Sequence, residues 1–455
     1  GLRGTMKVGM NAMNVHTVAY ATQGLAQLII EEGRTADGVA IAYDSRNNSE
    51  LFAKTAARVL AAANIPAYLF DELRPTPELS FALRELHCVA GINITASHNP
   101  KQYNGYKAYW EDGAQLPPEH ADVVSATMQK LDIFEDVKLA DFDEALAAGK
   151  IVMLGRDMDE KYLACVQAQA VNPEAVKAVA DELKIVYSPL HGTGYRLVPE
   201  ILRRCGHKNV FTVDEQMVIS GDFPTVSKPN PEYKEVFDIG MKIADEVGSD
   251  LVVATDPDAD RVGVVTRTPD GSFTTITGNQ MGALLMDYIL TAYEETDTMP
   301  EIPFAVKTIV TTEMARQVAE RNGVACLDTF TGFKFMAEKK NEYNVVDEKN
   351  PEFASLQQFF GEDFVEETEY IAEKLELDYE VVQKALDACE AFSKIAEGNP
   401  EYIVEELDED GLPVKMISGD KMYAFITEQT GIDEATLDKI FDCEVDYFEQ
   451  FGNSE

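Results

Sequence analysis

Long apolar runs and a secretory leader are both missing from this sequence. No stretch reaches the roughly 18 consecutive apolar residues that a membrane-spanning helix requires. The start of the chain also lacks a charged segment followed by an apolar one, which is the pattern of a secretory leader. We therefore expect a soluble, cytoplasmic protein without a membrane partner.

Paired cysteines are missing as well. The six cysteines stand singly along 455 residues, without the close spacing that holds zinc or carries out thiol redox chemistry. We interpret them as reduced residues of the core.

Basic residues are scarce relative to acidic ones. The chain has 39 Lys and Arg against 80 Asp and Glu, a net charge of −41, which argues against nucleic acid or an anionic membrane as a partner. The acidity is concentrated in residues 341–455, which contain seven Lys, no Arg and 32 Asp or Glu, a net charge of −25. The final quarter therefore differs in kind from the rest of the chain.

Short apolar runs that read as strands alternate with helix-like segments over most of the chain. A length of 455 residues exceeds what one core accommodates and predicts about three domains. In the first third, the pattern predicts strands at 39–43, 67–70 and 89–94 and helices at 14–32, 49–63 and 78–86. This is the doubly wound α/β rhythm, and it returns near residues 184 and 277. We predict three consecutive doubly wound α/β/α domains, of which the first and third are either complete or incomplete.

The domain limits follow from breaks in this rhythm. We place the first domain at 1–145, the second at 146–275 and a partial third at 276–340. The acidic, weakly patterned segment at 134–148 is interpreted as a linker. Residues 341–455 are predicted to form an acidic, α-helical C-terminal region.

The first candidate site follows the strand at 89–94. That strand stops in Thr95-Ala96-Ser97-His98-Asn99-Pro100, a run of small and polar residues typical of the carboxyl edge of a parallel sheet, where ligands bind. Ser97 would expose a hydroxyl there, and His98 would serve as a proton carrier. The alternative is that Ser97 and Asn99 only shape a turn.

The second candidate site follows the apolar strand that ends at Thr255. The next residues are Asp256-Pro257-Asp258-Ala259-Asp260-Arg261, and three carboxylates so close repel one another unless a cation neutralises them. An EF-hand loop would need Gly at the sixth position and Glu at the twelfth, where this chain has Arg261 and Arg267. Acids beside one Arg instead suit Mg²⁺ together with a phosphoryl group. The alternative is a set of exposed turn residues.

A glycine-containing loop lies between these two segments. Ser188-Pro189-Leu190-His191-Gly192-Thr193-Gly194 joins a predicted strand to a predicted helix. Such a loop can present backbone N–H groups to a phosphate, but two glycines are weak evidence by themselves.

Both sites together carry a resemblance to a known family. The run Thr95 to Pro100 with Tyr103-Asn104-Gly105-Tyr106-Lys107, followed by Asp256 to Arg261, resembles the α-D-phosphohexomutase superfamily, in particular its bacterial phosphoglucomutase and phosphomannomutase branch. The likeness extends from Gly1 to about Lys339. It implies a phosphotransferase that interconverts sugar 1-phosphates and 6-phosphates through a phosphoserine and a bisphosphate intermediate.

The resemblance also implies roles for individual residues. Ser97 would be the phosphoserine, and Asp256, Asp258 and Asp260 would hold Mg²⁺ with a phosphoserine oxygen of Ser97 as a further ligand. By the same likeness, His98 and Arg261 would steady the phosphoserine, Lys107 would be a general acid or base, Arg3 would reach the site from a Gly-Leu-Arg loop, and Lys334 would line the site. Glucose 1,6-bisphosphate would be the phosphorylating activator. The substrate would be a phosphosugar, with glucose expected and mannose or a pentose as alternatives.

The chain departs from that family pattern in its last quarter. Gly361-Glu362-Asp363-Phe364 only approaches the family's sugar-gripping loop, and nothing matches the phosphate loop of its fourth domain. Residues 370–389 instead resemble residues 425–443, about 54 to 55 positions later, which predicts two copies of a helix, turn and helix unit.

Two hypotheses of different classes follow. In the first, the protein is a phosphohexomutase, whose activity would be impaired by the absence of the fourth domain. In the second, it is a truncated or fused homologue without efficient turnover, a scaffold whose acidic C-terminal region contacts another protein.

Overall fold

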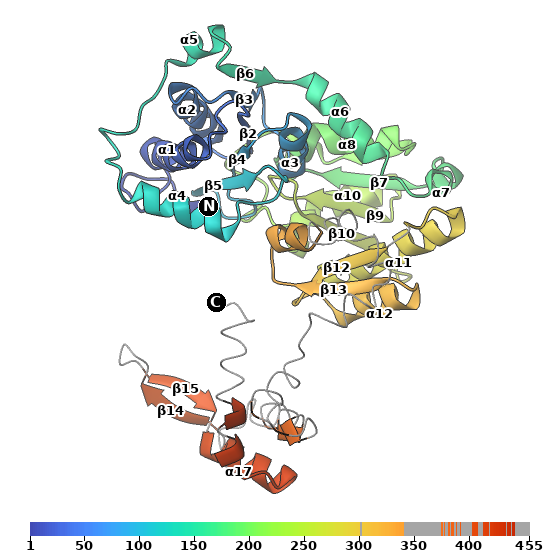
Figure 1. Ribbon diagram of the computed structural model, residues 1–455. Helices are drawn as coiled ribbons and strands as arrows, with labels where there is room; N and C mark the ends of the chain where they lie inside the picture. The colour runs from blue at the N-terminus through green and yellow to red at the C-terminus, as the bar shows by residue number, and fades with distance from the viewer. Residues whose placement is uncertain are drawn as a thin grey trace. The chain divides into compact units, whose positions relative to one another are not determined.

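The computed structural model describes residues 1–300 and 303–340. Beyond these it describes single helical or loop positions between 375 and 392, the backbone of 403–407 and 413–417, and most of 419–441. The chain divides into two units, residues Gly1–Asn344 and Val345–Glu455, which we describe separately (Figure 1). In the part of the chain so described, no helix combines the length and the apolar character needed to cross a membrane.

The first domain is built on a mixed sheet of six strands. Its strands, in sheet order, are β1 (Leu2–Thr5), β5 (Tyr103–Trp110), β4 (Ala90–Ile94), β2 (Val39–Tyr43), β3 (Ala67–Phe70) and β6 (Ile151–Leu154). The strands β4, β2, β3 and β6 run parallel to their neighbours, while β5 and β1 are antiparallel additions at one edge. The buried run at β2, apolar at every position, is typical of a strand covered on both faces.

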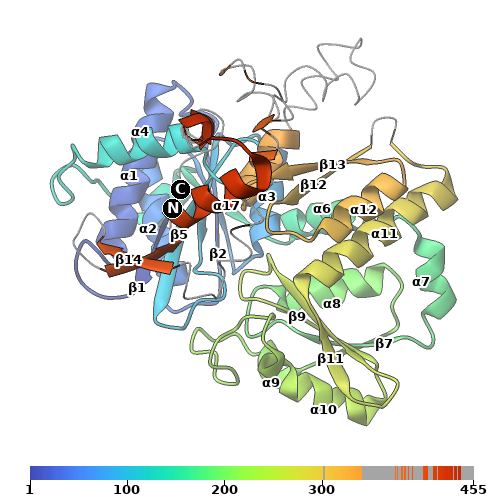
Figure 2. The same cartoon turned by 90° about the horizontal axis from the view of Figure 1, so that it is seen from below.

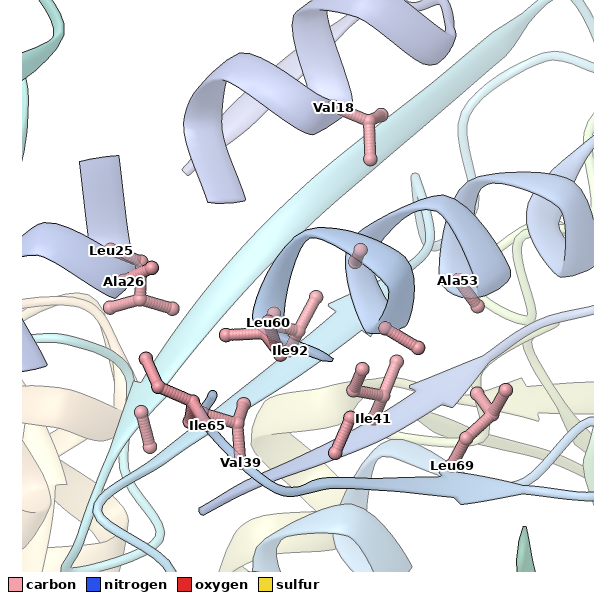
Figure 3. Close-up of a cluster of buried hydrophobic side chains, with 14 of the residues drawn as sticks. Val18, Leu25, Ala26, Val39, Ile41, Ala53, Leu60, Ile65, Leu69 and Ile92 are labelled. Carbon is pink, nitrogen blue, oxygen red and sulfur yellow. The ribbon is translucent and has the colours of Figure 1, made fainter. Parts of the chain in front are cut away.

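Helices cover both faces of this sheet, as the doubly wound pattern predicts. The helices are α1 (Val15–Glu31), α2 (Ser49–Ala62), α3 (Thr76–Glu85), α4 (Pro118–Met128), α5 (Phe142–Ala147) and α6 (Arg156–Gln167). Val39 and Ile41 of β2 pack with Leu25 and Leu60 of α1 and α2 (Figure 3). The intervening Ala40 and Ala42 pack with α3 on the opposite face. Alternate residues of one strand therefore enter two separate core layers.

Two predictions about the first domain are wrong in detail. The first sheet includes β6, which pairs with β3, so the predicted boundary at residue 145 lies inside the first domain and the presumed linker contains α5. Gly1 to Gly4 was expected as a loop, but Leu2–Thr5 forms β1 along β5. In both cases the strand is specified by hydrogen bonds to a partner that is distant in sequence, which a local pattern does not reveal.

The second domain repeats the arrangement with a five-stranded sheet. Its strands, in sheet order, are β11 (Phe273–Ile276), β10 (Val262–Arg267), β9 (Leu251–Thr255), β7 (Lys184–Ser188) and β8 (Asn209–Thr212). Its helical elements are α7 (Pro173–Val179), α8 (Gly194–Arg204), α9 (Asp214–Met217), the 3-10 helix η1 (Lys234–Phe237) and α10 (Asp238–Val247). The sheet lies between α8 and α10 (Figure 2). The strands predicted near 184 and 250 are confirmed.

Both domains use the same connection at their candidate sites. In the first, the parallel strand β4 leads through the Ser97 loop into the antiparallel β5. In the second, the parallel strand β9 leads through the Asp256 loop into the antiparallel β10. The two loops therefore occupy equivalent positions in two copies of one architecture, at the carboxyl edge where ligands bind.

The third domain is described as far as residue 340. It contains α11 (Gly278–Thr296), β12 (Phe304–Thr308), α12 (Glu313–Arg321) and β13 (Ala325–Thr329), with β12 and β13 parallel. The helix α11 begins with a capping box, in which Thr277 and Gln280 exchange side-chain and backbone hydrogen bonds. Leu290 of α11 packs with Ala319 and Cys326, which confirms an α/β unit of the predicted kind.

The second unit has a small core of its own. Val382 and Ala385 are fully buried together with Leu437 and Ile440, which stand 55 positions later in the chain. The repeat of a helix, turn and helix unit stays a prediction. The helix α17 (Gly419–Thr430) belongs to the same core. An antiparallel hairpin of β14 (Ile403–Leu407) and β15 (Pro413–Ile417) was not predicted. The run 361–364 and most of 370–380 lie outside the described residues.

Candidate functional site

The Ser97 loop presents a buried hydroxyl at the end of β4. Ser97 is only 3% exposed, and its backbone N–H donates to Oγ1 of Thr95 at 2.8 Å. Its φ angle of 51° places it in the left-handed region, which is unusual for a residue other than glycine. An outlier of this kind is typical of a functional loop that the surrounding structure holds in place.

The hydroxyl of Ser97 meets the acidic loop of the second domain. Its Oγ donates to Oδ2 of Asp256 at 2.8 Å and lies 3.1 Å from Nδ1 of His98. Asp256 follows β9 directly and is 0% exposed. The structure therefore brings together Ser97, His98 and Asp256, as the sequence analysis expected for two loops that shared one site.

The three aspartates of the acidic loop converge. One carboxylate oxygen from each of Asp256, Asp258 and Asp260 lies within 4.8 Å of the others. Oδ1 of Asp258 and Oδ1 of Asp260 are buried and have no hydrogen-bond partner. Buried, unpartnered carboxylate oxygens are costly, and they are the ligands that Mg²⁺ prefers. The residues present therefore fit a divalent cation.

Lys107 neutralises part of this acidic cluster. Its Nζ donates to Oδ2 of Asp258 at 2.9 Å and to Oδ2 of Asp260 at 3.4 Å. Burial by itself would raise the pKa of Asp258, but the charge of Lys107 together with hydrogen bonds from Asp256, Lys107 and Thr76 outweighs burial and lowers that pKa to about 2. Burial would likewise lower the pKa of Lys107, but the carboxylates, Asp258 first, raise it above its usual value.

The pKa values of the other site residues shift in the directions that their surroundings dictate. Burial raises the pKa of Asp256, and the neighbouring carboxylates of Asp258 and Asp260 raise it further. Burial lowers the pKa of His98, and the positive charges of Arg261 and Arg3 add to this effect. Both shifts are toward the uncharged form of the group, as burial dictates.

Two buried polar residues that sequence reasoning missed hold Asp258 in place. Oγ1 of Thr76, at the start of α3, donates to Oδ2 of Asp258 at 3.0 Å, and its backbone N–H donates to the carbonyl oxygen of Asp258 at 2.8 Å. Nδ2 of Asn93, on β4, donates to Oγ1 of Thr76 at 2.7 Å. The sequence marks these two residues only weakly: Thr76 lies between two prolines, and Asn93 is a polar residue inside an apolar strand.

The glycine-containing loop at 188–194 packs directly against the acidic loop. The backbone N–H of Thr193 donates to the carbonyl oxygen of Pro257 at 2.9 Å. A Cβ atom placed on Gly192 would lie 2.4 Å from Cα of Pro257, so only glycine fits this close contact. The loop is buried against protein, which disfavours its interpretation as a phosphate cradle.

The remaining predicted residues lie around this centre. Nη1 of Arg3 lies 3.4 Å from Oδ1 of Asn99 in the Ser97 loop. Arg261 pairs with Glu232 at 3.1 Å, with its backbone N–H donating to Oδ1 of Asp256 at 3.1 Å. Burial, and after it the charge of Lys334, lowers the pKa of the amino group of Gly1. Their roles toward phosphate stay predictions.

Sequence comparison identifies three successive domains of one family. The profile of the phosphoglucomutase/phosphomannomutase α/β/α domain I matches residues 1–133, that of domain II matches 160–271 and that of domain III matches 277–353. Together these cover more than half of the chain. The third match runs past residue 340, where the sequence analysis ended the likeness.

Curated relatives agree with these domains. A phosphoglucomutase of Staphylococcus saprophyticus is 36% identical over 383 residues, which is 84% of this chain and 66% of that protein. A phosphoglucomutase of Staphylococcus aureus is 33% identical over 376 residues, 82% of this chain and 65% of that protein. This chain therefore spans just under two thirds of the length of these relatives.

Solved structures show the same fold. A putative phosphomannomutase from Thermus thermophilus superposes with a TM-score of 0.60 at 24% identity, over 76% of this chain and 71% of that one. A phosphoglucomutase/phosphomannomutase family protein from Burkholderia thailandensis gives a TM-score of 0.57 at 19% identity, over 75% of this chain and 68% of that one. With its three consecutive family domains, this chain belongs to the phosphoglucomutase/phosphomannomutase family of α-D-phosphohexomutases.

Proposed function

We propose that this chain is a phosphohexomutase that moves a phosphoryl group between the 1- and 6-oxygens of a hexose, with glucose as the expected sugar. The observation that carries this proposal is the 2.8 Å hydrogen bond from Oγ of Ser97 to Oδ2 of Asp256, which joins the loops of two domains. The family membership and the relatives named phosphoglucomutase support the same activity.

Asp256, Asp258 and Asp260 would hold Mg²⁺, with an oxygen of the phosphorylated Ser97 side chain as a further ligand. Their convergent oxygens and the two unpartnered Oδ1 atoms support this assignment. When bound, the cation would neutralise the charge that develops on the transferred phosphoryl group.

Ser97 would act as the nucleophile that takes the phosphoryl group from glucose 1,6-bisphosphate. The bond between the serine Oγ and phosphorus forms while the bond between phosphorus and one sugar oxygen breaks. The hydroxyl proton passes to Nδ1 of His98, which lies 3.1 Å from Oγ, and the released sugar oxygen takes up a proton. Lys107, 13% exposed beside both loops, is our candidate donor for that sugar oxygen.

The reverse transfer would complete the cycle. Phosphoserine 97 donates its phosphoryl group to the free hydroxyl of a phosphosugar, which yields a bisphosphate that turns round in the site before it phosphorylates Ser97 again. His98 lies 3.1 Å from Oγ of Ser97 and would steady the phosphoserine together with Arg261. Arg3 and Lys334 supply further cationic side chains for the phosphate of the substrate. The location in the cytoplasm and a protein partner for the acidic C-terminal region remain predictions.

A coupled assay tests this function. Glucose 1-phosphate is supplied with Mg²⁺ and catalytic glucose 1,6-bisphosphate, and glucose 6-phosphate formation is followed. Turnover should occur in the wild type and in Ser125→Ala, a change on the exposed face of α4, and should be lost in Ser97→Ala. Mannose 1-phosphate and ribose 1-phosphate serve as parallel substrates for the alternative specificities. A folded wild type that turns over none of the three would favour the scaffold hypothesis.

A further inference from the structure

A buried guanidinium lies under the Ser97 loop. Arg46 follows β2 and its side chain is 0% exposed. Its two terminal nitrogens donate to four backbone carbonyl oxygens of one loop, those of Ser97, Asn99, Pro100 and Tyr103. The distances for Pro100 and Tyr103 are 3.0 and 3.1 Å. One side chain therefore contacts the loop at both of its ends.

Few backbone hydrogen bonds within the loop hold its shape. Among its own backbone contacts, the N–H of Asn99 donates to the carbonyl oxygen of Ala96 at 3.1 Å, and that of Tyr103 donates to the carbonyl oxygen of Pro100 at 3.0 Å. The left-handed conformation of Ser97 needs external support because a side chain crowds the backbone there. The hydrogen bonds from Arg46 to the backbone carbonyls provide that support.

The guanidinium is itself fixed from two directions. Its Nε lies 3.2 Å from Oδ2 of Asp44 at the end of β2, and Oδ1 of Asp44 accepts from Oγ of Ser49 at 2.7 Å. From the second domain, the ring of Phe223 lies 5.2 Å from the guanidinium carbon, within the range of a cation–π contact. The loop that carries Phe223 approaches so closely that a Cβ on Gly221 would lie 2.3 Å from the backbone N of Asn47.

We propose that Arg46 is the positioning residue of the phosphoryl acceptor: it holds the Ser97 loop in its strained conformation and joins it, through Phe223, to the second domain. This inference rests on the proposed function. Arg46 does not touch the reacting atoms. The four N–H donors on the two terminal nitrogens of its planar fork match the four carbonyls, and Nε faces the carboxylate of Asp44 as an ion pair, whereas the three donors of a lysine radiate from a single atom and do not span these groups.

The test compares Arg46→Lys with Arg58→Lys. Arg58 is a matched control because it lies in the same domain, where its Nε donates to the carbonyl oxygen of Ala140 at 2.8 Å. The initial rate of phosphate uptake by Ser97 from glucose 1,6-bisphosphate, measured by intact mass, should fall about 100-fold in Arg46→Lys, the cost expected from a misplaced reacting group. The rate in Arg58→Lys and the affinity of Arg46→Lys for Mn²⁺ should stay within about threefold of the wild type. Equal rates in Arg46→Lys and the wild type would overturn the proposal.

Amide hydrogen exchange separates this proposal from the proposed function. Exchange at the amides of Ser97, Asn99 and Tyr103 should speed up in Arg46→Lys while exchange in α2 stays unchanged, because only the loop loses its support. A wild type that takes up no phosphate refutes the proposed function, and the exchange result then decides the role of Arg46 alone. Unchanged exchange in the loop refutes that role.

A second variant covers the case in which Arg46→Lys does not fold. Phe223→Leu leaves the hydrogen bonds of Arg46 in place and removes the ring beside it. It should slow phosphate uptake by about tenfold, in line with the usual strength of a cation–π contact. Uptake at the wild-type rate would refute the link through Phe223 to the second domain.

Discussion

Nζ of Lys107 lies 2.9 Å from Oδ2 of Asp258, across the boundary between two domains and 151 positions of sequence. The lysine comes from β5 and the aspartate from the loop after β9. Because Asp258 is 0% exposed, this ion pair is the main local compensation for its charge. The pair also fixes the acidic loop against the sheet that carries Ser97.

Replacing Lys107 with methionine should destabilise the protein by about 3 kcal/mol in the absence of divalent cations, since a buried carboxylate loses its partner. Saturating Mg²⁺ should recover most of this loss, because a cation placed among the aspartates takes over the role of the ammonium. Urea denaturation with and without Mg²⁺ measures both values. Lys101→Met, at an exposed pair with Asp222, is the control and should change stability by less than about 0.5 kcal/mol. The same loss with and without Mg²⁺ would contradict this account.

Divalent cations should stabilise the wild type by binding to its folded state. At 100 times the dissociation constant the expected gain is about 2.7 kcal/mol. Asp258→Asn removes one of the converging carboxylates and should abolish most of the gain, whereas Asp287→Asn on the exposed side of α11 should retain it. Thermal unfolding at increasing Mg²⁺ concentration measures the stabilisation. Titration with Mn²⁺, followed by electron paramagnetic resonance, measures binding of the cation. Equal stabilisation of the two variants would argue against a metal site at the acidic loop.

Gly192→Ala should displace the acidic loop. The added Cβ would meet Cα of Pro257 at 2.4 Å, and relief of this overlap should cost roughly 1–3 kcal/mol. The affinity for Mn²⁺ should fall with it, because Pro257 separates two of the metal-binding aspartates. Gly278→Ala meets no atom within 4 Å and serves as the control in the same binding titration. Unchanged Mn²⁺ affinity in Gly192→Ala would show that the loop tolerates the shift.

Glu78 should make the stability of the protein depend on pH. It is 0% exposed on α3, and burial, followed by the nearby carboxyl of Asp159, raises its pKa to about 9. In the unfolded chain the same group ionises near its ordinary pKa of 4.5. Between these two values the folded state binds the extra proton, so this group lowers stability by up to about 1.4 kcal/mol for each unit of rising pH.

The variant Glu78→Gln removes this titration. The difference between its free energy of unfolding and that of the wild type should increase in favour of the variant as the pH rises from 5 to 8. Urea denaturation midpoints at several pH values measure this difference. Glu85→Gln, at an exposed carboxylate paired with Lys161, should keep the wild-type slope. Parallel pH profiles for the wild type and Glu78→Gln would mean that Glu78 ionises normally in the folded protein.

The parts of the fold that could be predicted are those set by local pattern. The apolar run at 39–43 and the helix after Asn14 coincide with β2 and α1 because burial on two faces and a capping side chain both leave a mark in nearby residues. The loops at Ser97 and Asp256 were found because each follows such a strand. Their meeting in one site followed from the family resemblance, and the hydrogen bond between them agrees with it.

The parts that could not be predicted depend on partners far apart in the sequence. The strand β6 is defined by pairing with β3, and β1 by pairing with β5. Thr76 and Arg46 act through hydrogen bonds to loops 182 and about 50 positions away, and no spacing in the sequence marks such contacts. Supporting residues such as Thr76 and Arg46 could therefore not be predicted from the sequence, whereas the residues that form the site could.

The most direct test of the central claim is the mass of the intact protein after incubation with glucose 1,6-bisphosphate and Mg²⁺, followed by peptide analysis. The account predicts one added phosphoryl group located on Ser97, present in the wild type and absent from Ser97→Ala. A folded wild type that gains no phosphoryl group, or that gains one equally in Ser97→Ala, would contradict the assignment of Ser97 as the phosphoryl acceptor.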